Sequence, residues 1–409
     1  MLTDTKELLV AQEAHRAGRA EEAEQGYMRW LDAHPNEHNG LHFLGLLKFQ
    51  TKRLQEGIDL VRRSLEFDAT NAHAWNNLGN MLVVSDLPKD ATDAYLNATR
   101  YAPELVEAWY NLGVCYRRTG KIEDSVKSFV KAVELQPANP MVYERFGILL
   151  YGLGRFAEAA NVYRQWLVVE PDSSVARHML AAMTGEDVPA RADDQYLKDL
   201  FDRFSSSFDE NLKGLGYRAP ELLVSALGEY VPTDGRLDVL DAGCGTGLCG
   251  GLLRSMSRSL VGVDLSDGMV EKARARNIYD ELVVAELCGF MRDRPNAFDV
   301  VISADTLVYF GALEEAALAA RSCIRENGVF AFTLERHIDE PVADPQPGMA
   351  PAAGDPVRYR IQPHGRYVHH ADYVRAALTA GGFTRVELKD VVLRRERGQD
   401  VQGHLVVAQ

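Results

Sequence analysis

A 34-residue period runs through the first half of this 409-residue sequence and constrains its fold more than any other feature. Three series of residues follow this period in one register. The first series is made of glycines, at Gly45, Gly79, Gly113 and Gly147. The second is Pro35, Ala69, Pro103, Pro137 and Pro171, and the third is Tyr27, Val61, Tyr95, Phe129 and Tyr163. A fixed period of this length indicates stacked copies of one helical unit.

The period predicts helix pairs over residues 4–37, 38–71, 72–105, 106–139 and 140–173. Within each pair the glycine would let two helices approach closely. The proline would end the second helix, because it has no N–H to continue the ladder of hydrogen bonds. The motifs AWNNLG at 74–79 and AWYNLG at 108–113 resemble the tetratricopeptide repeat. The resemblance implies an all-α solenoid of about five repeats over residues 1–183.

The concave face is where such solenoids usually bind peptides. Asn77, Asn80, Asn111 and Arg117 lie on the predicted first helices and could line that face. An ordinary solvated polar surface is the alternative for each of them. The residues of the three periodic series are expected to serve packing.

Composition and charge exclude several classes of function. Hydrophobic residues make up 46% and charged residues 25%, which is typical of a folded globular protein. The net charge is −14, with 20 Lys and Arg against 26 Asp and Glu in residues 1–190, and 25 against 33 in residues 191–409. Neither half has the basic excess that nucleic acid or an anionic membrane demands. We therefore expect no nucleic-acid partner and no membrane association.

The cysteines and the apolar runs suggest a location. The cysteines are at positions 115, 244, 249, 288 and 323, without a CxxC pair, so we expect small core residues and no metal site. No apolar run approaches the roughly 18 residues that a membrane helix needs, and the start of the chain does not look like an export signal. A cytoplasmic protein is the expectation.

The pattern changes after TGEDVPARAD at 184–193, which we interpret as a linker. Short apolar segments then alternate with helical stretches, which predicts βαβ units and a mostly parallel, Rossmann-like sheet. The predicted strands are LDVLDAG at 237–243, SLVGVD at 259–264, ELVVAEL at 281–287, FDVVIS at 298–303 and GVFAFTLE at 328–335. Ligands of such sheets bind at the carboxyl ends of the strands.

Acids and glycines gather at those carboxyl ends. A GxGxG turn formed by Gly243, Gly245 and Gly247 follows the first strand, and Asp264 ends the second strand 21 residues after Gly243. Asp264 could accept hydrogen bonds from both hydroxyls of a ribose. Glu286, after the third strand, could accept from an exocyclic adenine amine, with Leu265, Met269 and Leu287 covering the ring faces. Acids without a nearby base suit a cationic adenosine ligand better than a pyrophosphate.

Residues 200–409 resemble the class I S-adenosylmethionine-dependent methyltransferases. The resemblance rests on VLDAGCGTG, VGVDLS, VVAEL and FDVVISADTLVYF. It implies a methyltransferase domain over residues 194–409, with a seven-stranded sheet whose last strand is antiparallel. It also implies S-adenosylmethionine as the cofactor, with S-adenosylhomocysteine as the product. The implied cofactor contacts are Asp241, Gly243, Gly245, Gly247, Asp264, Met269 and Glu286.

The segments 201–212 and 215–223 resemble the cap helices of the branch that includes malonyl-carrier and quinone methyltransferases. We expect these caps within residues 194–231. The whole chain is similar to bacterial predicted methyltransferases with an N-terminal repeat array. It departs from related enzymes in having Glu286 where many have Asp, and Phe208 where related enzymes often have Tyr.

Candidates on the acceptor side follow the later strands. Asp305 and Tyr309 follow the fourth strand and His337 the fifth, and we name these three as catalytic candidates. The substrate-binding candidates are Phe208, Tyr217, Arg360, Arg366, Tyr367 and His369. The last four lie in a segment that could be a lid facing the substrate or a plain solvated turn. Its two arginines would suit a carboxylate or a phosphate.

Two further segments carry an expectation. Residues 340–356 contain five prolines and predict a long irregular loop where an acceptor lid would sit. Arg394, Arg395, Glu396 and Arg397 form a charge run, which we interpret as a solvated edge.

Three functions remain open from the sequence. The leading one is a methyltransferase whose array recruits a peptide, a protein or a carrier-bound acceptor. The second is a methyltransferase of a free small molecule whose repeats serve oligomerisation, for example in a homodimer. The third is an adaptor or assembly factor that keeps the methyltransferase fold without turnover.

Overall fold

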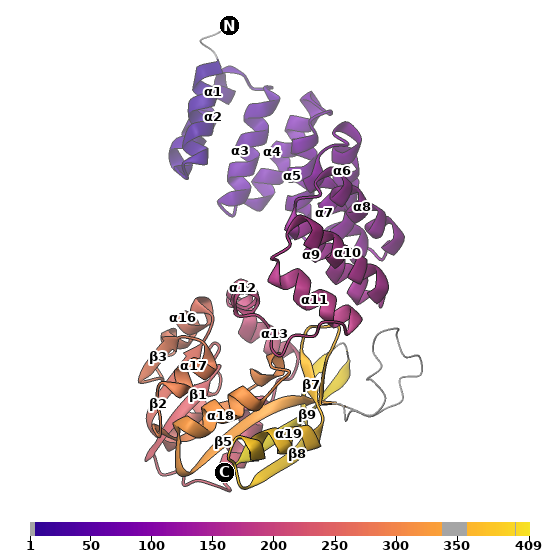
Figure 1. Cartoon of the computed structure of the whole chain (residues 1–409). Coiled ribbons are helices and arrows are strands. Elements are labelled where there is room, and N and C mark those ends of the chain that lie inside the picture. Colours follow the sequence, from indigo (N-terminus) through magenta and orange to yellow (C-terminus); the bar gives the residue numbers. More distant parts are fainter. Residues whose placement is uncertain (1–4, 338–357, 397) are drawn as a thin grey trace. The chain divides into compact units, whose positions relative to one another are not determined.

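The computed structural model describes residues 5–337, 358–396 and 398–409 (Figure 1). The chain divides into two compact units, Met1–Leu153 and Gly154–Gln409. The predicted loop at 340–356 and Arg397 lie outside the described residues.

The first unit is a row of helix pairs that follows the predicted repeats (Figure 1). Its helices are α1 (Thr5–Arg16), α2 (Ala20–Ala33), α3 (His38–Gln50), α4 (Leu54–Phe67), α5 (Ala72–Val84), α6 (Pro88–Tyr101), α7 (Val106–Arg118), α8 (Ile122–Leu135) and α9 (Pro140–Gly152). The prediction of an all-α repeat array is confirmed. The second helix of the fifth predicted repeat, α10 (Phe156–Val169), belongs to the second unit.

The glycine series and the aromatic series meet inside the repeats. A Cβ on Gly79 would overlap the ring of Tyr95, and a Cβ on Gly113 would lie 2.9 Å from Cδ2 of Phe129. The members of the aromatic series are buried, with at most 2% of their surface exposed: Tyr27, Val61, Tyr95, Phe129 and Tyr163. In the second, third and fourth repeats, the side chain of the aromatic series therefore fills the space that the glycine leaves in the partner helix.

A further 34-residue series appears at the turns between the helices of a pair. Left-handed backbone occurs at Gly18, Lys52, Asp86, Gly120 and Gly154, with φ of 74°, 63°, 57°, 77° and 71°. Glycine adopts this conformation without steric cost, which explains its presence at three of the five positions. Lys52 and Asp86 interrupt the glycines of this series, so glycine spacing alone does not reveal it.

The second unit begins with helices and continues as alternating strands and helices. The opening helices are α10, α11 (Ser174–Thr184), α12 (Asp194–Phe204), α13 (Phe208–Gly214) and α14 (Ala219–Leu227). The strands are β1 (Leu237–Ala242), β2 (Ser257–Asp264), β3 (Glu281–Val284), β4 (Phe298–Ser303), β5 (Ile324–Arg336), β6 (Tyr359–Ile361), β7 (Tyr367–His369), β8 (Val386–Glu396) and β9 (Gln399–Ala408). The later helices are α15 (Gly250–Leu253), α16 (Asp267–Ala275), α17 (Leu287–Arg292), α18 (Glu314–Cys323) and α19 (Ala371–Ala380).

The main sheet has the strand order β3-β2-β1-β4-β5-β9-β8. The pairs from β3 to β5 are parallel, and β9 runs antiparallel to both β5 and β8. This confirms the predicted mostly parallel sheet with an antiparallel last strand. A short β6–β7 hairpin is added to it, because β7 pairs with the end of β5 beyond the last residue paired with β4.

Helices cover both faces of this sheet (Figure 1). Leu240 and Val301 pack on one face with residues of α17 and α18, whereas Val239 and Val300 pack on the other face with residues of α14 and α15. Neighbouring residues of one strand point to opposite faces, so both must be apolar when both faces are covered. The cysteines at 115, 244, 249, 288 and 323 are buried, as predicted.

The segment interpreted as a linker belongs to the second unit and is hydrogen-bonded to other residues of it. We call residues 189–192 the strap. The backbone of Ala190 accepts from Gly311 N (2.8 Å), Ala192 N donates to Tyr309 O (2.8 Å), and the hydroxyl of Tyr367 donates to Pro189 O (2.8 Å). These bonds order residues whose composition predicts an irregular linker. The exact domain boundary stays a prediction.

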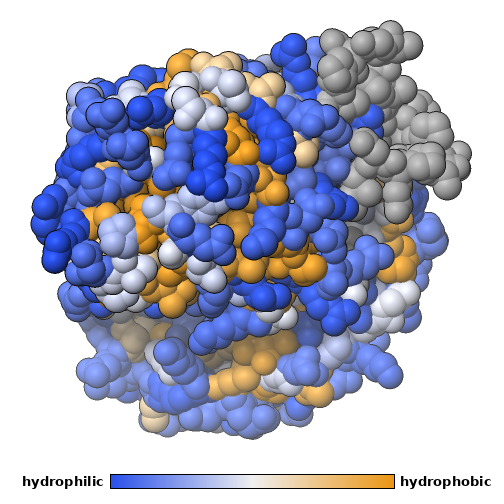
Figure 2. Space-filling view, turned by 90° about the horizontal axis from the view of Figure 1, so that it is seen from below, coloured by the Kyte–Doolittle hydropathy of each residue, from blue (hydrophilic) through white to orange (hydrophobic). Residues whose placement is uncertain are grey.

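The surface of the chain is mixed. In the view of Figure 2, hydrophobic residues lie among hydrophilic ones over the face turned to the reader. Within the described ranges, we find no helix with both the length and the apolar character needed to span a bilayer.

Candidate functional site

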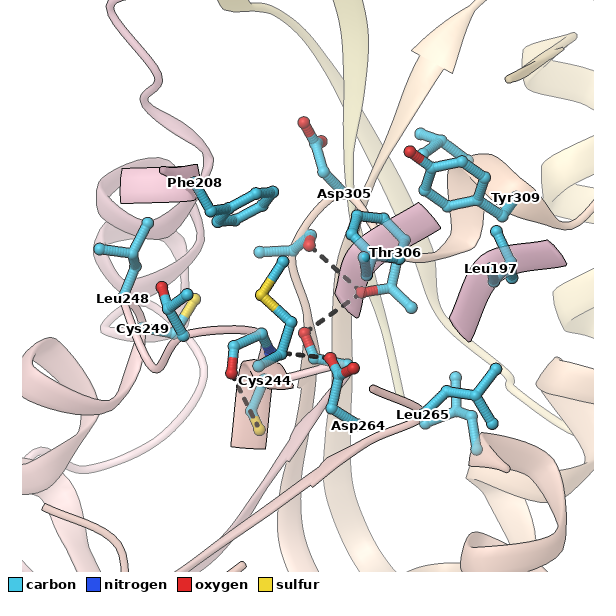
Figure 3. A pocket seen from close by; sticks show the side chains of 18 of the residues that line it. Leu197, Phe208, Cys244, Leu248, Cys249, Asp264, Leu265, Asp305, Thr306 and Tyr309 are labelled. Carbon is cyan, nitrogen blue, oxygen red and sulfur yellow. Dashed lines mark hydrogen bonds between the residues drawn. The ribbon is translucent and has the colours of Figure 1, made fainter. Parts of the chain in front are cut away.

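A pocket of about 240 Å³ lies where β1, β2, β3 and β4 end, within the second unit. Phe208, Leu248 and Cys249 lie on one side of it, and Thr306, Tyr309 and Leu265 on the other (Figure 3). Seven of the nine predicted cofactor residues line this pocket: Gly243, Gly245, Asp264, Leu265, Met269, Glu286 and Leu287.

The glycine loop needs its glycines for different reasons. Gly243 has φ +79°, and a Cβ there would overlap the side chain of Thr306. Gly245 has φ +53°, but a Cβ there would meet no atom within 4 Å, so this glycine borders open space. A ligand can therefore approach the backbone of Gly245 closely. Gly247 lies against Tyr279 and Arg276 and does not line the pocket.

Asp264 is fixed beside that open space. Its Oδ2 accepts from Gly245 N (2.8 Å) and its Oδ1 accepts from Ser266 N (2.9 Å). Burial raises the pKa of Asp264, while the N–H groups of Ser266 and Gly245 act in the opposite direction. Each carboxylate oxygen can accept about two hydrogen bonds, so both keep capacity for ligand donors.

Asp241 does not line the pocket. It is 1% exposed, and its Oδ2 accepts from the hydroxyl of Tyr279 (2.6 Å). Burial raises the pKa of Asp241 to about 7. Because Tyr279 also packs against Gly247, Asp241 supports the loop from behind rather than facing the pocket.

Glu286 forms the N-terminal cap of α17. It accepts from Cys288 N (2.9 Å) and Gly289 N (2.6 Å), and Arg191 Nη1 donates to its Oε1 (2.8 Å). Burial opposes ionisation, but the two N–H groups and the guanidinium together hold the pKa of Glu286 below its usual value. Glu286 is therefore an ionised acceptor at the edge of the pocket. Arg191 was missed, because it falls in the predicted linker.

The cap helices are tied to the loops that follow β1 and β2. Asp202 of α12 accepts from Ser266 Oγ and from Gly268 N (3.1 Å), and Asp209 of α13 accepts from Thr246 Oγ1. Leu197, Phe201, Phe208 and Leu212 of these helices line the pocket with apolar surface. The predicted caps thus form one apolar wall of the pocket beside the glycine loop.

Asp305 and Tyr309 line the pocket, as do Phe208 and Tyr217. Asp305 has φ +51°, a conformation that costs energy outside glycine and often marks functional positions. Its Oδ1 accepts from Thr333 Oγ1 (2.8 Å), and its Oδ2 accepts from Arg394. Burial raises the pKa of Asp305, whereas Arg394 and Thr333 act to lower it.

A buried ion cluster borders Asp305. Arg394 is 5% exposed and contacts Asp305, Glu335 and Glu396, so its interpretation as part of a solvated edge is wrong. The register of β8 shifts between Val392 and Arg394, which turns this side chain inward. Arg366 completes the cluster through Glu335 (2.6 Å) and Glu396 (2.8 Å). Both guanidinium groups already pair with carboxylates of the protein.

The other acceptor-side candidates lie away from the pocket. Tyr367 and His369 are fully buried, and Nε2 of His369 donates to Phe310 O (2.8 Å). Burial lowers the pKa of His369 to about 4, so this histidine is neutral. Arg360 of β6 and His337, which follows β5, do not line the pocket either. Of the predicted lid segment 359–373, Arg366 alone among the described lining residues reaches it.

Comparison with known proteins identifies both parts of the chain. Residues 239–328 match a family described as a methyltransferase domain, and residues 106–139 match the tetratricopeptide repeat. Methyltransferase-like protein 27 of Homo sapiens is 38% identical over 89 residues, which cover 21% of this chain and 36% of that protein.

Two further relatives are similar to parts of the chain. The malonyl-[acyl-carrier protein] O-methyltransferase of Geobacter sulfurreducens is 31% identical over 160 residues, which cover 37% of this chain and 57% of that enzyme. The tetratricopeptide repeat-containing protein trd-1 of Caenorhabditis elegans is 29% identical over 124 residues, which cover 30% of this chain and 16% of that protein. The chain thus spans less than two thirds of each of these relatives. It combines an array of tetratricopeptide repeats with a methyltransferase domain of class I.

Proposed function

We propose that this protein is an S-adenosylmethionine-dependent methyltransferase whose repeat array recruits a peptide, protein or carrier-bound acceptor. The observation that carries the proposal is the pairing of Gly245 with Asp264. A glycine that borders open space lies next to a fixed carboxylate at the end of β2, which suits the ribose of an adenosine ligand.

The charge of the pocket supports a cationic cofactor. Its lining contains five carboxylates, Asp194, Asp264, Glu286, Asp305 and Glu396, and three guanidinium groups, Arg191, Arg366 and Arg394. A net negative lining favours a sulfonium over a pyrophosphate. The residues present therefore fit S-adenosylmethionine, with Leu265, Met269 and Leu287 on the apolar side.

S-adenosylmethionine, when bound, supplies an electrophilic methyl group whose transfer leaves a neutral thioether and needs no acid. The residues of this chain would mainly orient the acceptor and exclude water. Such orientation is worth roughly 7–11 kcal/mol of the barrier in favourable cases. Phe201, Phe208 and Tyr309 supply the apolar wall for this, and the ring of Phe201 meets that of Tyr309 edge to face at 5.5 Å.

Asp305 is the residue best placed to hold a proton. If the acceptor arrives protonated, a carboxylate at the pocket wall can take the proton at Oδ1 or Oδ2. Burial raises the pKa of Asp305 and so increases its basicity. Tyr309 keeps its proton, because burial raises the pKa of its hydroxyl.

Calorimetric titration with S-adenosylmethionine and S-adenosylhomocysteine tests the proposal. We expect micromolar or tighter binding of both to the full chain, and at least a tenfold loss in Asp264→Ala, because hydrogen bonds to a charged group contribute about 1.5–3 kcal/mol each. No binding of either compound by a folded chain would refute the enzyme and favour the adaptor function.

The array is proposed to recruit the acceptor. Asn77 Nδ2 donates to His42 Nε2 (2.8 Å). Asn111 Nδ2 donates to Asn80 Oδ1 (3.2 Å), so these asparagines link neighbouring repeats. Arg117 is exposed. Replacing Asn77, Asn80, Asn111 and Arg117 with alanine should weaken capture of a cellular acceptor that is labelled with methyl-tritiated cofactor. Unchanged labelling at limiting acceptor would favour a free small-molecule substrate.

A further inference from the structure

The strap, residues 189–192, carries an arginine into the pocket. It follows α11 in the chain and is fixed along its length, because Ala190 O accepts from Gly311 N (2.8 Å) and Ala312 N (2.7 Å), and Ala192 N donates to Tyr309 O (2.8 Å). Arg191 forms an antiparallel bridge with Phe310 in this arrangement. The backbone bonds on both sides of Arg191 fix the direction of its Cα–Cβ bond, and its side chain lines the pocket.

Three partners hold the guanidinium of Arg191. Nη1 donates to Glu286 Oε1 (2.8 Å), Nη2 donates to Asp194 (3.2 Å), and the group lies 5.6 Å from the centre of the Phe310 ring. About a third of the side chain is exposed, as is about a quarter of Glu286 (32% and 26%). The pair therefore lies at the rim of the pocket, where solvent and ligand can both reach it.

The contacts of Glu286 leave room for one more donor. Oε1 accepts from Cys288 N (2.9 Å) and Arg191 Nη1 (2.8 Å), whereas Oε2 accepts from Gly289 N (2.6 Å). An ionised carboxylate offers about four acceptor positions, so three are filled and the remaining one is on Oε2. A neutral N–H donor on a ligand suits that position. If a carbonyl replaced this donor, its oxygen would face Oε2 of Glu286, and the two hydrogen-bond acceptors would repel each other.

We propose that Arg191 is a positioning residue for the cofactor: it fixes the Glu286 carboxylate so that Oε2 accepts from the exocyclic amine of adenine. This inference rests on the proposed function and adds to it a contribution from outside the region that matches methyltransferase domains, which begins at residue 239. The strap follows α11, which ends at Thr184, so a segment that lies between α11 and α12 would complete the cofactor site.

The anchoring of α11 supports this view. His178 of α11 is 2% exposed, its Nε2 donates to Gly365 O (2.8 Å), and its ring stacks on Tyr196 at 4.6 Å. The hydroxyl of Tyr367 donates to Pro189 O (2.8 Å) at the start of the strap. Helix α11 and the start of the strap are thus both held against the β6–β7 hairpin, on the N-terminal side of Arg191.

The test compares S-adenosylhomocysteine with S-inosylhomocysteine, in which a carbonyl replaces the exocyclic amine. Both are titrated against the full chain, its Arg191→Ala variant and its Arg191→Lys variant. We expect the unaltered chain to prefer the adenine compound by about tenfold or more, since the contact involves a charged group. Arg191→Ala should lower this preference at least threefold, and Arg191→Lys should restore part of it.

Arg292→Ala is the matched control. Arg292 lies at the other end of α17, is half exposed, pairs with Glu315 (2.7 Å) and does not line the pocket. Its replacement removes the same charge and one ion pair from the same helix, so the preference should not change. Thermal unfolding of each variant checks that the second unit remains folded.

A double variant tests whether Arg191 acts on the ligand preference through Glu286. The Glu286→Gln variant should have a smaller preference for the adenine compound than the unaltered chain. The double variant, with Arg191→Ala added, should have nearly the same preference as Glu286→Gln alone. Equal loss of both ligands in Arg191→Ala, or an unchanged preference, would overturn the role of Arg191. If the unaltered chain binds neither ligand, the proposed function itself fails.

Discussion

The contacts that stabilise the repeat array join residues that are close in the sequence. Those that stabilise the methyltransferase unit join residues that are far apart in it. In the array, Gly79 packs against Tyr95, only 16 residues later in the sequence. In the second unit, Arg394 pairs with Asp305 from 89 residues away, and Arg191 pairs with Glu286 from 95. Short separations recur in every repeat and leave a period in the sequence. Long separations occur once and leave none.

The difference also concerns how a local change spreads. Each repeat contacts its neighbours, so the stability of an array is close to a sum of local contributions. The second unit instead gathers strands from distant parts of the chain around one sheet and one ion cluster. We expect a substitution in the array to act on adjacent repeats, and one in the cluster to act on the whole second unit.

The largest expected effect is that of Arg394→Ala. It would leave the carboxylates of Asp305, Glu335 and Glu396 short of a partner, which costs about 3–5 kcal/mol for a buried pair. Hydrogen exchange followed by mass spectrometry should show faster exchange in β5, β8 and β9 and no change in α3 to α6. Arg395→Ala is the control, because Arg395 is 68% exposed and its loss should cost under about 0.5 kcal/mol. Equal effects of the two variants would contradict the cluster.

Gly79→Val is expected to come next, and to act on the array. The added side chain would overlap the Tyr95 ring, and overpacking of this kind costs about 1–3 kcal/mol. Exchange should accelerate in α5 and α6 and their neighbours, while the sheet strands stay protected. Gly120→Asn serves as the control, since Gly120 has φ +77° with no atom within 4 Å of a Cβ, and asparagine tolerates that conformation. Faster exchange throughout both units would show that they unfold together.

His178→Ala tests which unit α11 stabilises. It would remove the bond to Gly365 O and leave a buried carbonyl unpaired, at a cost of about 1–3 kcal/mol. Burial lowers the pKa of His178, so the native residue is neutral and no charge is lost. We expect faster exchange in α11 and in the β6–β7 hairpin. If residues of the first unit respond and the hairpin does not, the division of the chain at Leu153 is wrong.

The smallest effect is a pH dependence in the array. Hydrogen bonds from Arg53 and Lys48 lower the pKa of Glu24 to about 2 from an ordinary 4.5. The folded pKa is depressed, so the stabilisation is present above about pH 4.5 and is lost as the pH falls toward 2. The free energy of unfolding in urea should be measured between pH 5 and pH 2.5, with hydrogen exchange in α2 to α4 as the probe. The slope of this free energy against pH should be flatter for Glu24→Gln than for the unaltered chain. An identical slope would contradict a role for this ion pair.

Much of the candidate site could be predicted from the sequence. Gly243, Gly245, Asp264, Leu265 and Met269 are found because each lies at a fixed place after a strand, and parallel strands end at one edge of the sheet. Asp305 and Tyr309 follow by the same reasoning. The prediction failed for Arg394, since a β-bulge turned a residue of a charged run inward. It missed Arg191, because bonds to Tyr309 and Gly311 order a segment with linker composition.

The array, the alternation of strands and helices, and the glycine loop with its acid could all be predicted from the sequence. These features depend on neighbours within about 34 residues, so they repeat or follow a strand at a fixed spacing. Which side chains outside those motifs face the pocket is seen only in the folded chain. Folding brings Arg191, Arg366 and Arg394 to the pocket from three separate segments, and it buries Tyr367 and His369 against the strap and the turn before α18. Side-chain direction at such positions depends on contacts between residues far apart in the chain, and no local spacing encodes them.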